Sequence, residues 1–262
     1  MNNMERNALK DKIKNGEKTI GTIVTMTDPA VARIVGSAGF DFIWIDLEHS
    51  RISFETLFAH ILAVKAGGSA VIVRVPQDDL TYTKKVLEMG VDGIIFPMIH
   101  TAEQANIMIG HTLYPPYGTR GCGPQNATVF GKTDMLQYVG NTKNELARFI
   151  QIEHISAVKN LDVIMKNEEI DGYIFGPYDL SGSIGRLGQV YGEENVALLK
   201  EAADKLKKAG KYIGLATGDP SENSLKFWSG LGVDMIAAGE DFALLRQKAE
   251  LTKRTLDEHF LK

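Results

Sequence analysis

Eight short runs of apolar, mostly β-branched residues recur along the chain and constrain its fold more than any other feature. Longer stretches separate the runs, and in these stretches apolar residues return every three or four positions, as they do in amphipathic helices. Strands that alternate with helices are typical of a parallel sheet. We predict strands at residues 19–24, 42–46, 70–74, 93–97, 149–153, 172–176, 212–216 and 235–239.

A short sequence echo stands directly before three of these strands, at Gly39-Phe40-Asp41, Gly90-Val91-Asp92 and Gly232-Val233-Asp234. Glycine can end a helix with a positive φ angle, so each echo predicts a turn from helix into strand. Eight strand–helix units predict a single (β/α)8 TIM barrel, an α/β fold of about 250 residues, as one domain over residues 1–262. A doubly wound open sheet is the main alternative, although no G-x-G-x-x-G motif follows the first strand.

Charge and cysteine content exclude several classes of protein. The chain has 29 basic and 33 acidic side chains and a formal net charge of −4, whereas a nucleic-acid-binding protein needs an excess of Lys and Arg. Cys122 is the only cysteine, which excludes an internal disulfide and a cysteine-rich zinc site. Neither a signal peptide nor an apolar run of about 20 residues is visible, so we expect a cytoplasmic protein without a membrane partner.

Residues 112–145 interrupt the rhythm of strands and helices. This segment has no clear strand and contains Pro115, Pro116 and Gly118 in close succession. A connection of this length is uncommon unless it is functional. Because it follows the fourth strand, we place it on the side where barrel enzymes assemble their sites and predict that it forms or covers the active site. A solvated surface excursion is the alternative.

Polar side chains gather at the carboxyl ends of the predicted strands, which meet at one mouth of a barrel. The stretches concerned are Asp46-Leu47-Glu48-His49, Arg74, Gln151-Ile152-Glu153 and Gly176-Pro177-Tyr178-Asp179. Side chains two positions apart on a strand share a face, so Gln151 and Glu153 should both point into the barrel. We predict that these polar residues form one site.

Glu153 and Asp179 are separated by one strand–helix unit, so neighbouring strands should bring their carboxylates together. Two nearby anions repel each other unless one takes up a proton or a cation lies between them. We predict a divalent metal, Mg²⁺ or Mn²⁺ with Co²⁺ as a further candidate, because the ligands are oxygens and no thiolate is at hand. Ordinary salt bridges to basic residues are the alternative.

Arg74 and His49 are candidate catalytic residues. Arg74 could stabilise an oxyanion through its planar fork, or it could form a structural ion pair with a nearby carboxylate. His49 is a candidate general acid or base that Asp46 could orient, although a lone loop histidine is often incidental. A Schiff base would need a lysine that projects inward from a strand, whereas Lys18 and Lys211 precede their strands and others lie on predicted helices. A metal is therefore preferred over a lysine as the electron sink.

Several stretches in this order resemble the HpcH/HpaI aldolase family, the metal-dependent class II hydroxy-oxo-acid aldolases of the pyruvate and phosphoenolpyruvate barrel enzymes. The stretches are Gly39-Phe40-Asp41, Ile45-Asp46-Leu47-Glu48-His49, Val73-Arg74, Phe96-Pro97-Met98, Thr101-Ala102-Glu103-Gln104-Ala105, 114–121, Gln151-Ile152-Glu153 and 176–181. They extend from the second strand to beyond the sixth, and together they are far more specific than any single motif.

The resemblance implies a lyase that reversibly splits a 4-hydroxy-2-oxo acid into pyruvate and an aldehyde through a metal-stabilised enolate. Glu153 and Asp179 would hold the metal, with Gln151 beside them. The backbone of the turn from Gly176 to Asp179, with Pro177 and Tyr178 between them, would bind the substrate carboxylate.

The resemblance also assigns roles at the reacting atoms. Arg74 would stabilise the enolate oxygen, and His49, with Asp46 close by, would move the proton of the substrate hydroxyl. We further expect Leu215 to contact the substrate. Acyl-CoA ester cleavage and oxaloacetate decarboxylation are alternatives with the same enolate chemistry, and a non-catalytic barrel that serves as an assembly subunit is another.

Relatives of this family are commonly hexamers with an exchanged C-terminal helix, so the resemblance implies a homo-oligomer. The tail at residues 242–260 is amphipathic and could pack on another subunit. Two residues depart from the family pattern. Tyr178 stands where alanine is common and would narrow the pocket. Glu88 replaces an aspartate thought to approach the histidine of a neighbouring subunit.

Overall fold

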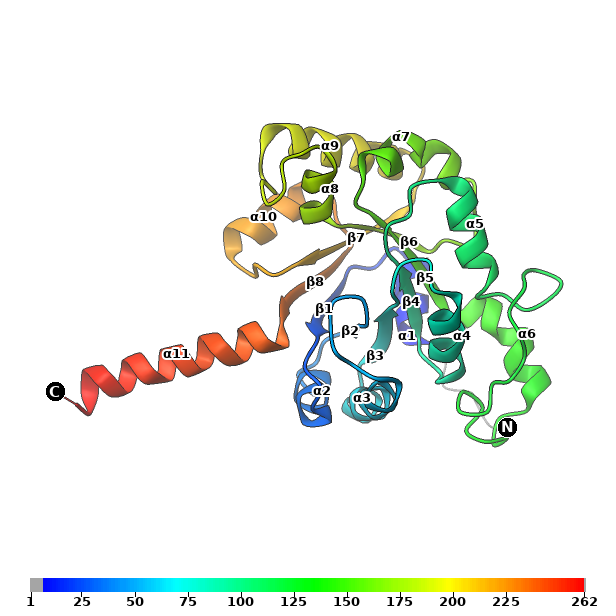
Figure 1. Cartoon of the computed structure of the whole chain (residues 1–262), viewed down its shortest axis with the longest axis horizontal. Helices are drawn as coiled ribbons and strands as arrows, with labels where there is room; N and C mark the ends of the chain where they lie inside the picture. The colour runs from blue at the N-terminus through cyan, green and yellow to red at the C-terminus, as the bar shows by residue number, and fades with distance from the viewer. Residues whose placement is uncertain (1–6, 262) are drawn as a thin grey trace.

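Eight parallel strands form a closed barrel in the computed structural model, which describes residues 7–261 (Figure 1). Each strand pairs with the next in sequence, and β1 pairs with β8. The strands are β1 (Thr19–Val24), β2 (Phe42–Asp46), β3 (Ala70–Arg74), β4 (Gly93–Phe96), β5 (Ala147–Ile152), β6 (Gly172–Phe175), β7 (Tyr212–Thr217) and β8 (Met235–Glu240). The predicted (β/α)8 barrel is confirmed, and the open sheet is excluded.

Helices connect successive strands and form the outer layer, and one further helix precedes the first strand and another follows the last. They are α1 (Ala8–Lys14), α2 (Pro29–Gly36), α3 (Phe54–Gly67), α4 (Leu80–Glu88), α5 (Ala102–Gly110), α6 (Met135–Glu145), α7 (Ile155–Ile164), α8 (Pro177–Ser183), α9 (Glu193–Lys208), α10 (Glu222–Gly230) and α11 (Asp241–His259). Gly39, Gly90 and Gly232 all have positive φ angles, as the echo before three strands predicts. None of the described helices is both long enough and apolar enough to cross a membrane.

Alternation along the strands divides the core into two layers. Phe42 and Trp44 point inward and belong to the cluster that fills the barrel. Ile43 and Ile45 point outward and pack against the helices. Because side chains alternate, Asp46 continues the inward series at the carboxyl end of β2. The strands thus carry polar side chains to the mouth while their middles remain apolar.

Helix α1 closes the amino end of the barrel. Leu9 and Ile13 belong to the cluster inside the barrel. Between them, Lys10 forms an ion pair with Asp171 and donates from Nζ to the Leu146 carbonyl at 2.9 Å. Burial lowers the pKa of Lys10 to about 8, although Asp171 opposes this shift. The opposite, carboxyl end of the barrel is left as the open one.

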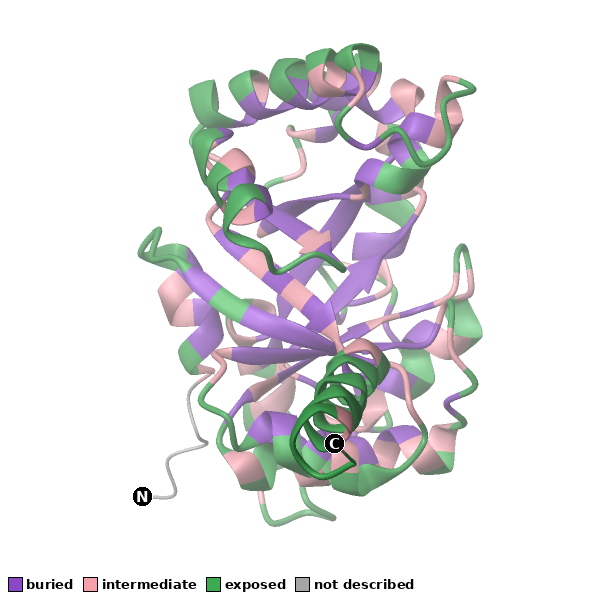
Figure 2. Cartoon of the chain, turned by 90° about the vertical axis from the view of Figure 1, so that its left-hand side faces the viewer, coloured by how far each residue is buried: buried purple, intermediate pink, exposed green. Residues whose placement is uncertain are grey.

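Helix α11 projects away from the barrel instead of covering it (Figure 1), and Figure 2 shows it exposed along nearly its whole length. Of its described residues, only Asp241 is buried. On the outward side of β1, next to β8, Ile20 is 55% exposed. In an ordinary barrel the last helix covers this part of the sheet. Here the β8–β1 face is left without it.

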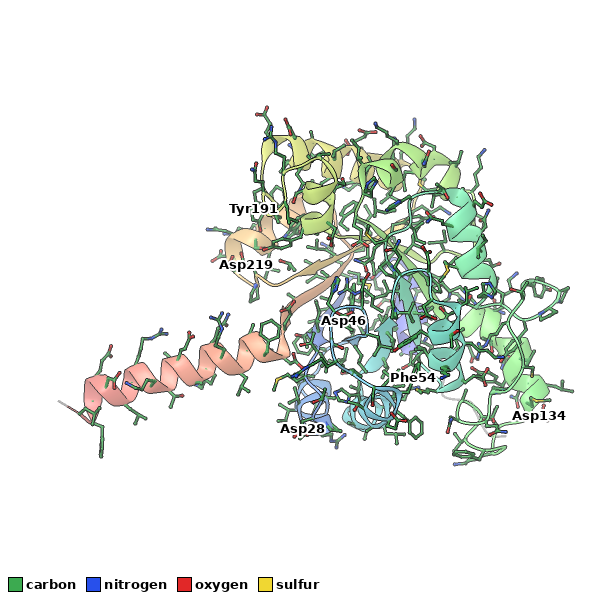
Figure 3. The ribbon with its side chains drawn as sticks, in the orientation of Figure 1. Asp28, Asp46, Phe54, Asp134, Tyr191 and Asp219 are labelled. Carbon is green, nitrogen blue, oxygen red and sulfur yellow. The ribbon has the colours of Figure 1, made fainter. Side chains whose placement is uncertain are left out.

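Residues 112–145 do not lie at the end of the barrel where we predicted them. They follow α5, and this helix returns the chain to the amino end of the strands. There the Ala127 N–H donates to the Glu88 carbonyl at 3.1 Å, and Arg120 Nη2 donates to the Leu87 carbonyl at 3.2 Å. The segment ends in α6, whose first cap, Asp134, lies at the opposite edge of the molecule from α11 (Figure 3). The prediction that this segment forms or covers the active site is therefore wrong within a single chain.

Candidate active site

A pocket of about 320 Å³ opens at the carboxyl ends of the strands, and we name it the mouth pocket. Its walls are formed by Ile23, Trp44, His49, Arg74, Gln151, Glu153, Gly176, Pro177, Tyr178, Asp179, Ala216, Thr217, Gly218 and Glu240. The mouth pocket brings together all of the site residues predicted from the sequence except Asp46 and Leu215.

Glu153 follows β5 and is only 2% exposed. Its Oε2 accepts a hydrogen bond from Gln151 Nε2 at 2.8 Å, and its Oε1 accepts one from the Met98 backbone N–H at 2.7 Å. Gln151 and Glu153 share the inward face, as predicted. Burial raises the pKa of Glu153 to about 7, although the Met98 N–H and Arg74 oppose this shift. A nearby cation would favour the charged form of such a desolvated carboxylate.

The turn after β6 brings a second carboxylate to the mouth pocket. Asp179 lies in the first turn of α8, which begins at Pro177. A Cβ atom on Gly176 would lie 2.3 Å from Glu153 Oε2, so glycine is required for this close approach. The first backbone N–H groups of a helix have no partner within the helix, and they favour an anion. Tyr178 and Asp179 lie in the first turn of α8, and both residues line the mouth pocket.

Glu153 and Asp179 fit a divalent cation that keeps water or substrate among its ligands. Carboxylate oxygens are the donors that Mg²⁺ and Mn²⁺ prefer, and both side chains line one pocket. Between residues 7 and 261, no group of three or more His, Cys, Asp or Glu side chains is arranged to hold a metal. Mg²⁺ is commonly bound by only one or two carboxylates together with water and substrate, so two carboxylates are enough for it.

Asp46 holds Arg74 with a fork of two hydrogen bonds. Arg74 Nε donates to Asp46 Oδ1 at 2.8 Å, and Nη2 donates to Oδ2 at 2.7 Å. The third nitrogen, Nη1, lies 3.1 Å from Glu48 Oε2 and 3.3 Å from Gln151 Oε1. The guanidinium carbon lies 5.3 Å from the centre of the Trp44 ring. Arg74 thus forms a structural ion pair, one of the two roles expected of it, and also lines the mouth pocket.

His49 lies at the rim of the mouth pocket with 67% of its side chain exposed, and Asp46 does not orient it. Asp46 is occupied by Arg74 and by the Glu48 backbone N–H, which donates at 3.0 Å. The carboxylate beside His49 is that of Glu48, whose Oε2 lies 3.9 Å from His49 Nε2. Burial raises the pKa of Glu48 while Arg74 opposes this shift. The expected Asp46–His49 contact is wrong here, because the bidentate pair with a guanidinium takes the Asp46 oxygens.

Leu215 does not reach the mouth pocket. It is 1% exposed and belongs to the layer between the strands and the helices. The next residue, Ala216, points into the barrel, and Ala216, Thr217 and Gly218 line the pocket instead. The expected substrate contact by Leu215 is therefore wrong, because the two-residue period of β7 turns this side chain outward.

Six residues of the pocket wall were not predicted from the sequence: Ile23, Trp44, Ala216, Thr217, Gly218 and Glu240. Thr217 and Glu240 end β7 and β8, where the rule that polar residues at carboxyl ends face the mouth applies to them as well. Applying the rule to every strand, and not only to strands with a recognisable motif, would have found both. Among the described residues that line the pocket, none is a lysine.

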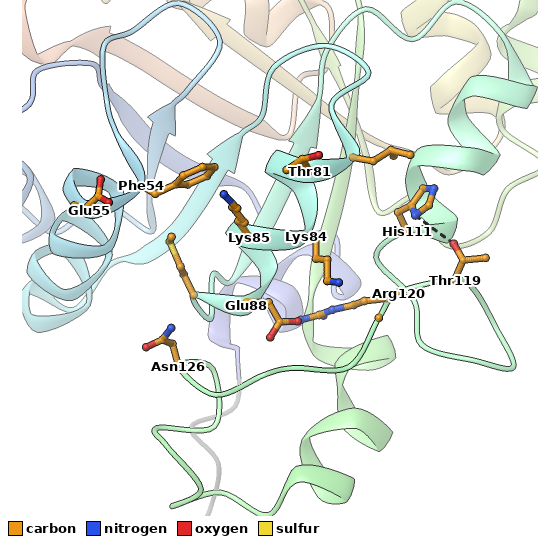
Figure 4. Close-up of a pocket in the computed structure, with 13 residues that line it drawn as sticks. Phe54, Glu55, Thr81, Lys84, Lys85, Glu88, His111, Thr119, Arg120 and Asn126 are labelled. Atoms are coloured by element: carbon orange, nitrogen blue, oxygen red, sulfur yellow. Dashed lines mark hydrogen bonds and ion pairs between the residues drawn. The ribbon is translucent and has the colours of Figure 1, made fainter.

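A larger cavity of about 850 Å³ lies elsewhere, between the starts of α3 and α4 and residues 119–126 (Figure 4). Glu88 and Arg120 line it, with 3.8 Å between Glu88 Oε1 and Arg120 Nη2. Both Glu88 carboxylate oxygens are buried without a hydrogen-bond partner among the described residues. Burial raises the pKa of Glu88, and Arg120 opposes this shift. None of the predicted site residues lines this cavity, so size alone does not make it the active site.

Comparisons with known proteins show which family and which proteins the chain is similar to. The model of the family described as HpcH/HpaI aldolase/citrate lyase matches residues 20–243. A hydroxypyruvate/pyruvate aldolase of Pseudomonas aeruginosa is 30% identical over 249 residues, which cover 95% of this chain and 92% of that protein. A 2-keto-3-deoxy-L-rhamnonate aldolase of Escherichia coli is 31% identical over 245 residues, which cover 93% of this chain and 91% of that protein.

The fold is also shared with a solved structure. The crystal structure of an HpcH/HpaI aldolase from Desulfitobacterium hafniense matches with a TM-score of 0.87 and 28% sequence identity. The match covers 95% of this chain and 96% of that chain. The likeness therefore extends over the whole barrel and not only over the motifs at its mouth.

Proposed function

Because the chain belongs to the HpcH/HpaI aldolase/citrate lyase family, we propose that it is a divalent-metal-dependent aldolase that reversibly cleaves a 4-hydroxy-2-oxo acid into pyruvate and an aldehyde. Its relatives are named as aldolases, which makes the chain a lyase, and the proposal adds the pyruvate product and the metal. The observation that carries it is the presence of Glu153, Asp179 and Arg74 in one pocket, where no described residue offers a lysine.

Glu153 and Asp179 would hold the divalent ion, which we propose to be Mg²⁺, Mn²⁺ or Co²⁺. Gln151 and the Met98 N–H would keep the Glu153 carboxylate in one orientation through their hydrogen bonds to its two oxygens. When bound, such an ion supplies positive charge that stabilises an enolate oxygen. The protein's contribution is to hold two carboxylates at the carboxyl end of a barrel whose interior is apolar.

The turn at the start of α8 and the guanidinium of Arg74 would bind the oxo-acid end of the substrate. The Tyr178 and Asp179 amides would receive the carboxylate, and Gly176 and Pro177 would form the turn that presents them. Arg74 would face the keto oxygen, and its fork with Asp46 fixes the guanidinium before the substrate arrives. A donor that is already oriented stabilises developing charge without a further cost of reorganisation.

His49 would act as the base for the substrate hydroxyl. As the hydroxyl at C4 loses its proton to the imidazole, the bond between C3 and C4 breaks and its electron pair enters the enolate. The aldehyde leaves, and protonation of the enolate at C3 gives pyruvate. The exposed position of His49 at the rim lets the imidazole exchange its proton with solvent.

We propose that the enzyme is a homo-oligomer, a hexamer by resemblance to its relatives, in which α11 is exchanged between copies. Apolar side chains on α11 are exposed, with Leu245 at 59%, Leu251 at 46% and Leu256 at 51%. The β8–β1 face that α11 leaves uncovered carries Ile20, also exposed. The same helix from a second copy would supply the missing cover on that face.

The experiment that tests the proposed function measures pyruvate release from a panel of 4-hydroxy-2-oxo acids by protein stripped of metal with a chelator. We expect release to stop and to return when Mg²⁺, Mn²⁺ or Co²⁺ is added. Release that chelation leaves unchanged would overturn the role of the metal. Borohydride with pyruvate should leave no covalent adduct, and a stable adduct would indicate a lysine instead. Acyl-CoA esters and oxaloacetate belong in the panel, since turnover of these alone would favour the alternative reactions.

A further inference from the structure

A bulge at Gly239 turns the side chain of Glu240 into the mouth pocket. Met235 and Ala237 point into the barrel, so simple alternation would give the next inward position to Gly239. Gly239 instead has a φ angle of 77°, and the register between β8 and β1 shifts so that Glu240 lies opposite Ile23. Glycine adopts a positive φ without the steric cost that other residues bear. The bulge thus places an acidic side chain in the pocket wall.

The Glu240 carboxylate has no structural task within the chain. It is half-buried, yet it forms no hydrogen bond or ion pair with any residue in the range 7–261 and does not cap α11. Burial raises the pKa of Glu240, the charges of Asp241 and Asp46 add to this shift, and the charge of Arg74 opposes it. A carboxylate in this position is therefore costly for folding and is unexplained by packing.

The next residue, Asp241, has a carboxylate with a clear structural role. Asp241 is 3% exposed and accepts hydrogen bonds from the backbone N–H groups of Thr25, Met26 and Phe242 and from the Thr25 hydroxyl, at 2.8 to 3.0 Å. These bonds tie the end of β8 to the loop after β1. Because Asp241 performs this task, Glu240 is free to serve a ligand.

Glu240 lies across the mouth pocket from the proposed metal ligands. Glu153 and Asp179 follow β5 and β6, whereas Glu240 ends β8, three and two strands further around the barrel. The oxo-acid end of the substrate would occupy the β5–β6 side. The β7–β8–β1 side, walled by Ile23, Thr217 and Glu240, is left for the aldehyde part of the substrate.

We propose, on the basis of the proposed aldolase function, that Glu240 determines which aldehydes this enzyme accepts. An ionised carboxylate accepts hydrogen bonds and donates none, so it favours aldehydes with hydroxyl groups next to the carbonyl. It repels aldehydes that carry a carboxylate, and the half-buried position strengthens that repulsion relative to water. The preferred partners are thus neutral hydroxyaldehydes, and anionic semialdehydes are rejected.

The test compares pairs of aldehydes of equal length in the direction of synthesis, with pyruvate and Mg²⁺ present. Succinic semialdehyde against butanal reports on charge, and glyceraldehyde against propanal reports on hydroxyl groups. Each result is a ratio of two kcat/KM values for the same protein preparation, so any loss of active enzyme cancels. The variants are Glu240→Gln, which keeps the shape and removes the charge, and Glu240→Ala, which removes the acceptor as well. Asp204→Asn removes a negative charge from the exposed surface of α9 and serves as the control.

We expect Glu240→Gln to raise the ratio of succinic semialdehyde to butanal about tenfold, which corresponds to about 1.4 kcal/mol. Glu240→Ala should also lower the ratio of glyceraldehyde to propanal about fivefold, while Asp204→Asn changes neither ratio. Ratios within twofold of the wild type in both Glu240 variants would overturn the proposal. Deuterium exchange into the pyruvate methyl group, measured on the wild type without aldehyde, keeps the two proposals apart. Exchange together with unchanged ratios contradicts only the role of Glu240, whereas absence of both exchange and cleavage contradicts the aldolase function.

Discussion

The mouth pocket and the outer surface of the barrel differ in whether buried charged side chains such as Arg74 and Glu88 have hydrogen-bond partners. At the mouth, Arg74 is bonded to Asp46, and Glu153 is bonded to Gln151, all within one chain. On the outer surface, both carboxylate oxygens of Glu88 are buried without a hydrogen-bond partner among the described residues. A buried polar group without a partner costs about 1–3 kcal/mol. Arg74 and Glu153 at the mouth are therefore satisfied within a single chain, whereas Glu88 on the outer surface would need a second copy to supply a hydrogen-bond partner.

The same contrast holds for apolar surface. Trp44 and Ile23, at the mouth, are buried in the barrel interior. Leu251 and Leu256, on α11, are about half exposed, and so is Ile20 on the uncovered face of β1. Within a single chain, the residues proposed for catalysis and those on α11 and β1 proposed for assembly are thus separate, and variants of one set should leave the other function intact.

The largest expected effect belongs to the mouth. Asp179→Asn keeps the size of the side chain and removes one of the two charges that would hold the metal. We expect the rate of pyruvate release to fall at least about 1,000-fold, which corresponds to about 4 kcal/mol in the barrier. Because Asp179 is exposed, the melting temperature and the oligomer mass should stay close to those of the wild type. A rate near that of the wild type would remove Asp179 from the site.

Arg74→Lys should have the next largest effect. Lysine keeps the positive charge but cannot reproduce the two parallel hydrogen bonds to Asp46 or present a planar donor to the keto oxygen. We expect kcat to fall about 100-fold, in line with the loss of an oriented oxyanion donor. Steady-state kinetics at saturating metal measures it. A variant that changes KM alone would show that Arg74 binds the substrate equally before and during the reaction.

Many residues of the mouth pocket were predictable because two regular repeats in the sequence determine where their side chains lie. The two-residue period of strands places Gln151 and Glu153 on one face, and the strand–helix repeat brings Asp179 next to Glu153. Both predictions hold in the structure. Leu215 shows where such prediction ends: a shift of one residue turns a side chain from the pocket to the helix layer, and no local signal in the sequence separates Leu215 from Ala216.

Choices between competing partners were not predictable. From the sequence, Asp46 could have formed a hydrogen bond with either His49 or Arg74. Only the structure shows that the register of β2 and β3 places Asp46 directly beside Arg74. The bulge at Gly239 likewise depends on the register between β8 and β1, which a single sequence does not show. Residues 112–145 were misplaced because they were assigned to the loop that follows the fourth strand, whereas α5 lies between β4 and this segment and returns the chain to the amino end of the barrel.

The third prediction concerns the outer surface. Leu251→Asp places a charge on the apolar side of α11, where we expect contact with a second copy. Burial of a leucine contributes about 2 kcal/mol, so association should weaken about 30-fold. Light scattering over a dilution series measures this change. Lys253→Asp, on the charged side of the same helix, is the control and should leave the mass unchanged. A wild type that is monomeric would contradict the exchange of α11.

The smallest expected effect lies where the two regions would meet. In the family an aspartate at the position of Glu88 is thought to approach the histidine of a neighbouring copy, and the two Glu88 oxygens without a hydrogen-bond partner are consistent with the same role for this longer side chain. We expect Glu88→Gln to lower kcat about fivefold, which corresponds to about 1 kcal/mol. Co-expression of Glu88→Gln subunits with His49→Ala subunits then tests whether Glu88 acts across the interface. In mixed oligomers, about one site in four would combine an intact His49 with an intact Glu88 of its neighbour.

The co-expressed mixture should therefore be more active than the His49→Ala oligomer. The control is a mixture of the two parent oligomers that were assembled separately, and it should not show the same gain in activity. If Glu88 acts only within its own chain, the activity of the mixed oligomers should equal the average of the two parent variants. A value above the average would require that the Glu88 carboxylate on the outer surface belongs to the active site of the next copy. The contrast between the two regions would then describe an isolated chain, and in the assembled enzyme the outer surface of one copy would complete the mouth of another.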